Sequence, residues 1–449
     1  MGVMDWFKKQ RPVEPGLYSG FLEVEGGTHR VHLRVNPSGS GVLTLDASRI
    51  LHVNATAAEL VKHLLDGRSE DETLARMAKR YRGVKKEVLH QDIHRICDSV
   101  KTLTATDQVC PLTDLNIELL EPYSPDLTAP LRMDLAVTYR CQNRCAHCYN
   151  QEARQVEELS TSDWRHVLNA CQKAGIPHVV FTGGEPTLRK DLPELVAYAE
   201  ELGLVAGLNT NGRRLKDPEY TRKLREAGLD HVQITLESAD PGIHNAMTRA
   251  DSFDDSLAGL RAAKAAGIYT LTNTTLTKVN VTGIENLVDL VAAEGLPAFA
   301  VNGMIYSGKG KSAGTDLSPQ EVVPALEWLA LRAREKGIRL VWYTPTRYCE
   351  LNPVEMGLGV KQCTAARISM AVEPDGTVIP CQSWYEGVGN ILRDPWEEIW
   401  NHPLCLRLRQ PQKPLAECEA CEHLALCGGG CPIEAEHHKL FCREVASGG

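Results

Sequence analysis

The middle of the chain alternates short apolar runs with longer stretches that carry apolar residues at helical spacing. The short runs predict six buried strands, at 134–138, 178–181, 205–208, 231–236, 269–276 and 298–301. The longer stretches predict helices between them, at 162–174, 192–202, 217–227, 253–266 and 284–294. Short apolar strands separated by helices pair in parallel, with the helices as crossovers. The pattern predicts an α/β fold, a partial (β/α)6 TIM-like barrel over residues 131–336.

A different pattern precedes the barrel. Alternating apolar and polar residues predict short strands, at 31–35, 41–45 and 50–53. Helical spacing follows in three stretches, at 55–65, 70–81 and 85–103. Strands followed by three helices predict a small winged-helix-like α+β domain over residues 16–103. Residues 104–130 contain several prolines and predict an extended linker before the barrel.

Three cysteines follow the first predicted barrel strand. Cys141, Cys145 and Cys148 have the spacing CxxxCxxC. Thiolates this close in sequence can hold one face of an iron–sulfur cubane, and three of them leave the fourth iron open to a substrate or cofactor. A structural zinc site is the alternative, because short cysteine clusters are also common zinc ligands.

A glycine-rich turn follows the second predicted strand, with the sequence Thr182-Gly183-Gly184-Glu185-Pro. Paired glycines let the backbone approach a ligand closely, and a fixed carboxylate can accept hydrogen bonds from an ammonium group. The same residues would also suit an ordinary turn before the next helix.

Taken together, the two motifs resemble the radical S-adenosylmethionine (SAM) enzymes, whose signature is CxxxCxΦC followed one βα unit later by GGEP. His147 occupies the usually aromatic Φ position. The resemblance implies a [4Fe–4S] cluster on Cys141, Cys145 and Cys148, with SAM on the open iron. In that family SAM is cleaved to methionine and a 5′-deoxyadenosyl radical, which abstracts hydrogen from the substrate.

The resemblance also implies SAM contacts at the carboxyl ends of the strands, where function lies in such barrels. The GGEP residues would bind the SAM amino group. Asn209 and Ser238 would reach its ribose and carboxylate, and Arg249 would pair with that carboxylate. Asn209 and its neighbours are also ordinary loop residues. A glycine-rich segment at 303–318, after the last strand, is expected to close over the substrate.

The strand and helix order of residues 16–103 resembles the PqqD-like recognition element of enzymes that modify ribosomally made peptides (RiPPs). Such domains capture the leader segment of a precursor peptide as an added strand at a sheet edge. A DNA-binding winged helix is the alternative. Its third helix would need a basic face, but acidic and basic residues alternate there, and the net charge of −9 also argues against a nucleic-acid partner.

The tail, residues 345–449, holds a second cysteine pattern. Cys363 is followed by Gly376 and Cys381, and the remaining cysteines of the pattern are Cys418, Cys421, Cys427, Cys431 and Cys442. This spacing resembles the SPASM domain of peptide-modifying radical SAM enzymes. By that resemblance, the first auxiliary cluster has the ligands Cys363, Cys381 and Cys431. The second has Cys418, Cys421, Cys427 and Cys442.

Seven cysteines are one short of two cubanes with four ligands each. Cys349 is the expected eighth ligand, completing the first auxiliary cluster. A zinc ribbon is the alternative for the tail, because CxxC pairs are common zinc ligands. Gln382 follows Cys381 where sulfatase-maturing relatives carry an aspartate base. Because an amide cannot take a proton, a sulfatase maturase is disfavoured.

These features predict an oxidative RiPP maturase, with SAM, one SAM-binding [4Fe–4S] cluster and two auxiliary [4Fe–4S] clusters as cofactors. Its partners would be a precursor peptide and an electron donor such as ferredoxin or flavodoxin. The auxiliary clusters would take the electron released when the product radical is oxidised, which suits a crosslink. No catalytic acid or base can be assigned. The alternatives are a radical SAM enzyme of tetrapyrrole or redox-cofactor assembly and a non-catalytic metal-binding peptide scaffold.

Compartment and membrane association follow from the apolar runs and the cysteines. No apolar run is long enough to span a bilayer, and the first ten residues do not resemble a secretion signal. We therefore expect a cytoplasmic protein without a membrane partner. Its fifteen cysteines are expected as metal ligands and buried thiols, since cytosolic thiols are kept reduced.

Overall fold

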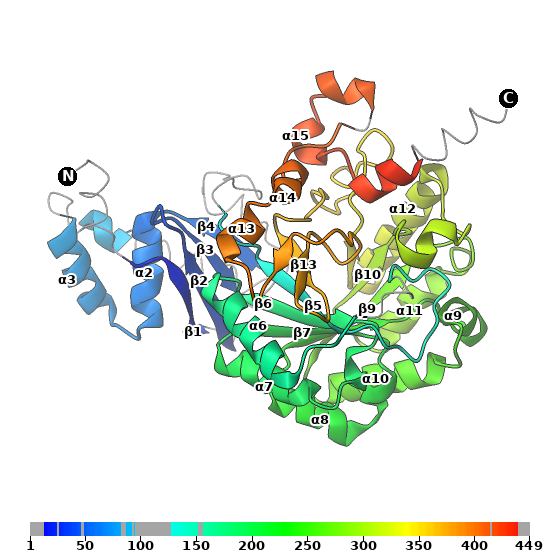
Figure 1. The fold of residues 1–449 in the computed structure, drawn as a ribbon, viewed down its shortest axis with the longest axis horizontal. Helices are drawn as coiled ribbons and strands as arrows, with labels where there is room; N and C mark the ends of the chain where they lie inside the picture. The colour runs from blue at the N-terminus through cyan, green and yellow to red at the C-terminus, as the bar shows by residue number, and fades with distance from the viewer. Residues whose placement is uncertain are drawn as a thin grey trace. The chain divides into compact units, whose positions relative to one another are not determined.

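The computed structural model describes residues 13–24, 27–45, 49–81, 87–91, 94, 127–150, 156–413 and 415–438. The chain forms two compact units. The first comprises Met1–Leu131, Leu168–His178 and Glu201–Val205, and the second comprises the remainder. The parallel sheet begins in the cyan part of Figure 1, and the tail runs from yellow to red.

The first unit contains a four-stranded antiparallel sheet in the order β1-β2-β3-β4. Its strands are β1 (Gly16–Val24), β2 (Gly27–Val35), β3 (Gly41–Leu45) and β4 (Arg49–Val53). The three strands expected from the sequence are present, but β1 and the first half of β2 were not predicted. Val31, Leu33 and Val35 alternate along β2 and are buried in the core.

Two helices follow this sheet. α2 (Ala55–Leu65) begins after Asn54, whose side chain accepts a hydrogen bond from the Ala57 amide. α3 (Glu70–Arg80) begins with a capping box between Ser69 and Glu72. These helices agree with the predicted ones. The third predicted helix, at 85–103, lies mostly outside the described residues. Within this range, residues 87–91 are described and are helical.

The second unit is built on a sheet in the order β11-β10-β9-β8-β7-β6-β5-β12-β13-β14. The predicted strands appear as β5 (Arg132–Thr138), β6 (His178–Gly183), β7 (Val205–Thr210), β8 (His231–Thr235), β9 (Tyr269–Thr275) and β10 (Ala298–Asn302). β11 (Arg339–Trp342) pairs in parallel with β10, and β12 (Ser369–Val372) pairs in parallel with β5. The sheet therefore has more strands than the six predicted, because β11 is added beside β10 and the tail adds strands beside β5.

Crossover helices connect the parallel strands. They are α6 (Thr161–Lys173), α7 (Leu192–Glu201), α8 (Pro218–Glu226), α9 (Pro241–Thr248), α10 (Phe253–Ala265), α11 (Glu285–Ala293) and α12 (Pro319–Lys336). Short 3₁₀ turns lie at η1 (Pro186–Leu188), η2 (Arg213–Lys216) and η3 (Gly308–Ser312). α10 packs against β8 and β9, and α8 packs against α10 below the strands in Figure 1.

The tail continues the sheet with β13 (Thr377–Ile379) and β14 (Gly389–Asn390). β12 and β13 form the predicted hairpin, in which the Gly376 amide donates to the Glu373 carbonyl over 2.9 Å. Short helices follow at α13 (Trp396–Trp400), α14 (Pro403–Leu408), η4 (Ala416–Ala420) and α15 (Leu424–Cys427). In the described part of the chain, no helix is both long and apolar enough to cross a membrane.

Candidate functional site

A cavity of about 360 Å³ lies at the carboxyl ends of β5 to β10. It is bordered by the segment after β5, residues 139–150, which we call the cysteine loop. The predicted site residues that line it are Cys141, Cys145, Cys148, His147, Gly183, Gly184 and Asn209. Glu185, Ser238 and Arg249 are described by the structure but lie outside this lining. The strand ends thus bring most of the predicted site together.

Backbone hydrogen bonds hold the cysteine loop. The amides of Arg144 and Ala146 donate to the carbonyls of Thr248 and Met247, over 3.0 and 2.8 Å, at the end of α9. Burial raises the pKa of Cys141 to about 11 and raises the pKa of Cys145 well above its usual value. Such thiols stay protonated at neutral pH until a metal replaces the proton. Three convergent sulfur donors suit a soft metal cluster.

The paired glycines allow the turn after β6 to lie against the cysteine loop. A Cβ on Gly183 would lie 2.1 Å from the Thr138 carbonyl oxygen, and one on Gly184 would lie 2.4 Å from the Arg140 oxygen. The Gly184 amide donates to that Thr138 oxygen over 2.7 Å. Only glycine fits this close approach, so the turn is shaped by packing as well as by any ligand.

Glu185 is fully buried, and its carboxylate accepts four hydrogen bonds. The donors are the amide and hydroxyl of Thr187, the Thr210 hydroxyl at 2.7 Å and the Asn211 amide at 2.8 Å. Burial raises the pKa of Glu185, and these hydrogen bonds oppose that rise. The carboxylate therefore ties the turn after β6 to the end of β7. Its predicted contact with the SAM amino group stays a prediction.

His147 forms an ion pair with Glu237 at the end of β8. Its Nε2 lies 2.9 Å from Glu237 Oε1, and Glu237 Oε2 accepts a hydrogen bond from the Thr275 amide. Burial lowers the pKa of His147, but the charge and hydrogen bond of Glu237 outweigh it and leave the pKa raised. Glu237 is buried and lines the cavity, although the sequence analysis did not assign it to the site.

Other polar side chains project into the cavity from neighbouring strands. They are Gln233, Thr235, Asn273, Thr275 and Asn302. Asn273 Oδ1 is buried and has no hydrogen-bond partner among the described residues. An unsatisfied buried acceptor costs about 1–3 kcal/mol, so a ligand with hydroxyl or ammonium donors fits this position. The signal in the sequence was the alternation of Gln233 and Thr235 with apolar residues along β8, whereas β9 is polar along most of its length.

Ser238 and Arg249, two of the predicted SAM contacts, lie outside the cavity lining. The Ser238 hydroxyl accepts a hydrogen bond from the Asp240 amide over 3.0 Å, in the turn before α9. Arg249 ends α9 with φ 49° and is exposed. Their contacts with SAM also stay predictions. The predicted closing segment is packed against the cysteine loop, since the Lys309 amide donates to the Cys148 carbonyl over 2.8 Å.

Tyrosine hydroxyls join the cysteine loop to the tail. Tyr149 donates to Gln382 Oε1 over 2.5 Å, and Tyr139 donates to Glu373 Oε1 over 2.8 Å. From the tail, Tyr385 donates to the Asn150 side chain over 3.0 Å. The tail segment that carries Cys381 therefore lies beside the cavity.

The tail cysteines form two neighbourhoods. Burial raises the pKa values of Cys363, Cys381 and Cys431 to about 12, and each of these thiols is also affected by the charge of another of the three. The three thiols therefore lie close enough for their charges to affect one another. Cys418, Cys421 and Cys427 follow one another through η4 and α15, while Cys442 lies outside the described residues.

Cys349 lies beside the second set. Burial raises the pKa of Cys349, and Cys427 is the cysteine whose charge contributes to that rise. The amide of the preceding Tyr348 donates to Cys427 Sγ over 3.4 Å. The sequence predicts Cys349 as a ligand of the first auxiliary cluster, whereas its cysteine neighbour here is Cys427 of the second set.

Comparisons with known proteins match three segments of the chain. The radical SAM superfamily matches residues 135–291, the SPASM iron-sulfur cluster-binding domain matches 363–422, and coenzyme PQQ synthesis protein D matches 36–102. Fe-coproporphyrin III synthase of Methanosarcina barkeri is 33% identical over 332 residues, which are 67% of this chain and 82% of that protein. The chain belongs to the radical SAM enzymes. Its cofactors therefore include SAM and a [4Fe–4S] cluster, with auxiliary iron–sulfur clusters in the SPASM domain.

Two further similar proteins have names that mention a peptide. The PqqA peptide cyclase of Streptomyces rochei is 31% identical and covers 69% of this chain and 86% of its own. The structure of Streptococcus suis SuiB bound to precursor peptide SuiA shares the fold, with a TM-score of 0.67 and 16% identity over 93% of this chain and 96% of that one. The zinc site and the non-catalytic scaffold are therefore set aside, as is the DNA-binding winged helix in favour of the PqqD domain.

Proposed function

We propose that this radical SAM enzyme is a RiPP maturase that oxidises a precursor peptide, most simply by forming a crosslink. The observation that carries this proposal is the contact between the cysteine loop and the tail, through Tyr149 and Gln382. It sets a substrate-sized cavity next to the tail cysteines. The PqqD domain would bind the leader of the precursor, as the names of the peptide relatives suggest.

Within the cavity, Cys141, Cys145 and Cys148 would hold the SAM-binding cluster. When bound, the cluster and SAM supply the 5′-deoxyadenosyl radical that abstracts hydrogen. Gly183, Gly184 and Asn209 would contact SAM, and Glu185 would act by holding the end of β7. Asn273 would accept a hydrogen bond from SAM, and the Glu237 pair would orient His147.

The tail would take the electron from the substrate radical. Cys363, Cys381 and Cys431 would ligate the first auxiliary cluster, and Cys418, Cys421, Cys427 and Cys442 the second. Cys349 remains the proposed fourth ligand of the first cluster, because the four cysteines of the second already supply one thiolate for each iron. The substrate would lose a hydrogen atom to the 5′-deoxyadenosyl radical, giving 5′-deoxyadenosine, and then one electron to the tail and one proton to solvent as the new bond forms. A ferredoxin or flavodoxin would supply the electron that cleaves SAM. The cytoplasmic location expected from the sequence stays a prediction.

A second candidate is a small-molecule radical SAM enzyme of tetrapyrrole metabolism. The observation in its favour is the 33% identity with Fe-coproporphyrin III synthase, of which the chain covers 82%. In this case the cavity would take a porphyrin, and the PqqD domain would not take part in catalysis.

Mass spectrometry of substrates separates the two candidates. In one experiment, the enzyme is produced anaerobically together with the peptides encoded by short reading frames beside its gene. In a second, the purified enzyme is incubated with Fe-coproporphyrin III, SAM and reductant. A peptide that loses two hydrogens, dependent on Cys141, is the expected result. Conversion of the porphyrin with every peptide unchanged would contradict the proposal.

A further inference from the structure

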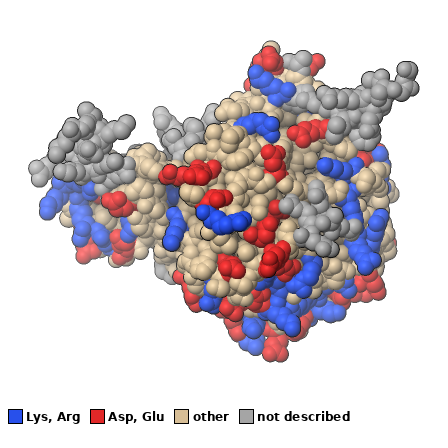
Figure 2. Space-filling model, viewed as in Figure 1, with Lys and Arg blue, Asp and Glu red and all other residues tan. Residues whose placement is uncertain are grey.

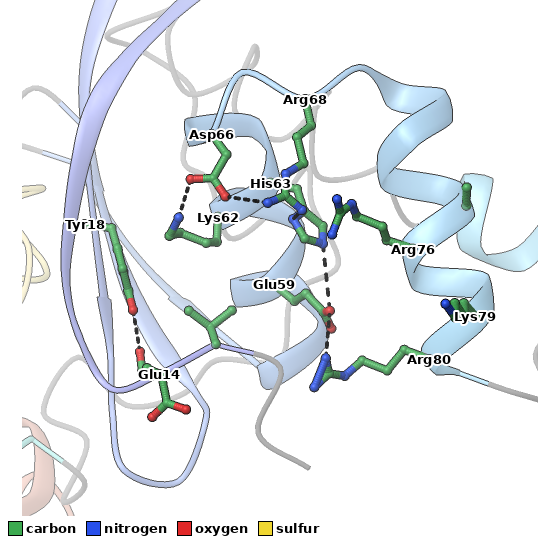
Figure 3. Close-up of a pocket in the computed structure, with 12 residues that line it drawn as sticks. Glu14, Tyr18, Glu59, Lys62, His63, Asp66, Arg68, Arg76, Lys79 and Arg80 are labelled. Atoms are coloured by element: carbon green, nitrogen blue, oxygen red, sulfur yellow. Dashed lines mark hydrogen bonds and ion pairs between the residues drawn. The ribbon is translucent and has the colours of Figure 1, made fainter. Parts of the chain in front are cut away.

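The first unit contains a second pocket, between β1, α2 and α3 (Figure 3), with a volume of about 790 Å³. Its lining carries six basic side chains, from Lys62, His63, Arg68, Arg76, Lys79 and Arg80. Three acidic residues, Glu14, Glu59 and Asp66, also line it. In a protein with a net charge of −9, this is a local excess of positive charge. Figure 2 shows Lys and Arg side chains gathered over α3, with acidic ones beside them.

Two of the three acidic residues are neutralised inside the pocket. Asp66 accepts a hydrogen bond from Lys62 and lies 3.3 Å from an Arg68 nitrogen, and the Lys62 hydrogen bond lowers the pKa of Asp66. Glu59 is buried, accepts a hydrogen bond from the Tyr81 hydroxyl and lies 3.6 Å from Arg80. These carboxylates are therefore committed to their neighbours.

Cations on α3 remain available. Arg76 and Lys79 are exposed, and neither has a carboxylate within ion-pair distance among the described residues. In Figure 3 the Arg76 guanidinium points from α3 toward His63 on α2. His63 Nε2 is buried without a hydrogen-bond partner in the described part of the chain, and its nearest carboxylate oxygen, on Glu59, is 3.8 Å away. The pocket thus offers two cations on α3 that have no ion-pair partner among the described residues, while His63 on α2 is within ion-pair distance of Glu59.

We propose that this pocket binds carboxylate side chains of an acidic segment of the precursor peptide. This inference rests on the proposed maturase function and gives the peptide a second contact, distinct from strand addition at a sheet edge. Arginine binds carboxylates through paired hydrogen bonds, which adds specificity to the nonspecific backbone pairing of an added strand.

A peptide fits this pocket better than a nucleic acid. The cations surround a concave site that also contains carboxylates, whereas nucleic acid needs a continuous basic stripe. The negative charge of the whole protein would repel a polyanion but would still allow a short acidic segment to reach a local positive site.

Fluorescence anisotropy of the full-length protein tests this assignment. The probes are labelled hexaglutamate, labelled hexalysine and a short oligothymidine, each titrated at low and high salt. Hexaglutamate is expected to bind, more weakly at high salt, and the Arg76→Glu, Lys79→Glu variant is expected to weaken it about tenfold or more. The milder Arg76→Gln, Lys79→Gln variant should show a smaller loss.

A matched control reverses two exposed cations on α8, with Lys223→Glu and Arg225→Glu, and should bind hexaglutamate like the wild type. Equal binding by the α3 and α8 variants would overturn the proposal, as would oligothymidine binding with the same dependence on Arg76 and Lys79. Formation of 5′-deoxyadenosine without peptide is measured on the same samples. A wild type that modifies a precursor peptide in the mass-spectrometric assay but does not bind hexaglutamate refutes the pocket alone, whereas a wild type that modifies no peptide refutes the proposed function.

Discussion

Tyr149 donates a hydrogen bond of 2.5 Å to Gln382, and each of these residues directly follows a cysteine. Cys148 precedes the tyrosine in the cysteine loop, and Cys381 precedes the glutamine in the tail. Burial raises the pKa of Tyr149 far above its usual value, so its hydroxyl remains a neutral donor at any working pH. The bond links the two cluster regions that the proposed mechanism connects.

The Tyr149→Phe variant should separate SAM cleavage from substrate oxidation. It deletes the hydroxyl and leaves Gln382 without this donor, at a cost of about 1–2 kcal/mol. We expect 5′-deoxyadenosine to form at near the wild-type rate while modified product falls, so the ratio of the two measured by chromatography rises. Tyr269→Phe, at an exposed tyrosine, is the control. An unchanged ratio in Tyr149→Phe would show that this contact does not couple the two steps.

Asn273 should contribute to SAM affinity, because its Oδ1 is buried without a partner among the described residues. Asn273→Leu, which keeps the branched shape of the side chain, removes this acceptor. A lost hydrogen bond of about 1–1.5 kcal/mol corresponds to an affinity about tenfold weaker, measurable by equilibrium dialysis with the reconstituted enzyme. Asn286→Leu, at an exposed position on α11, is the control. Wild-type affinity in Asn273→Leu would exclude this contact.

Asp191 should make the free energy of unfolding depend on pH in the acidic range. Burial alone would raise the pKa of Asp191, but hydrogen bonds from Arg189 and Thr161 leave the pKa lowered. Arg189 also donates to the Val137 carbonyl, at the end of β5. The pKa of Asp191 is lower in the folded than in the unfolded protein. Its charge therefore stabilises the fold fully above the unfolded-state pKa, and this stabilisation is lost as the pH falls through the folded-state pKa.

The variant Asp191→Asn should therefore lower the free energy of unfolding by about 1–3 kcal/mol at pH 7, with the difference shrinking below about pH 4. Urea denaturation of the apoprotein across this range measures it. Asp254→Asn, at an exposed aspartate on α10, should show a smaller loss at pH 7. If the loss of unfolding free energy in Asp191→Asn stayed constant down to pH 2.5, it would contradict the role assigned to the Asp191 charge.

Iron content should distinguish Cys349 from the buried tail ligands. Cys381→Ala breaks the set of mutually neighbouring thiols and should cost about four irons. Cys349→Ala should retain its iron, since three thiolates can hold a cubane, but should alter the electron paramagnetic resonance spectrum of one auxiliary cluster. The buried Cys405 offers the control Cys405→Ala. An unaltered spectrum in Cys349→Ala would remove Cys349 from the ligand set.

The parallel strands and the cysteine loop were predictable because their signals are local. β5, β6, β7 and β10 are largely apolar runs, and the paired glycines before Glu185 lie at the end of β6. β1 was missed because Gly16 and Gly20 interrupt its apolar pattern, and its stability comes from pairing with β2. The pairing of β12 with β5 joins segments far apart in the chain, which no local pattern reveals.

The roles of individual site residues were harder to predict for the same reason. The four hydrogen bonds of Glu185 come partly from Thr210 and Asn211, on the next strand along. The pairing of His147 with Glu237 depends on how β5 and β8 are placed in the sheet. Sequence motifs identified the residue types needed for the chemistry, but partners were set by the tertiary fold.

The most direct test of the account is a joint measurement of iron, sulfide and 5′-deoxyadenosine on anaerobically reconstituted protein. The wild type is compared with the triple variant Cys141→Ala, Cys145→Ala, Cys148→Ala. We predict about twelve irons in the wild type and about eight in the variant, with 5′-deoxyadenosine formed only by the wild type. About four irons with bound zinc in the wild type would make the tail a zinc ribbon and remove the proposed electron path. Formation of 5′-deoxyadenosine by the triple variant would contradict the central assignment of these cysteines.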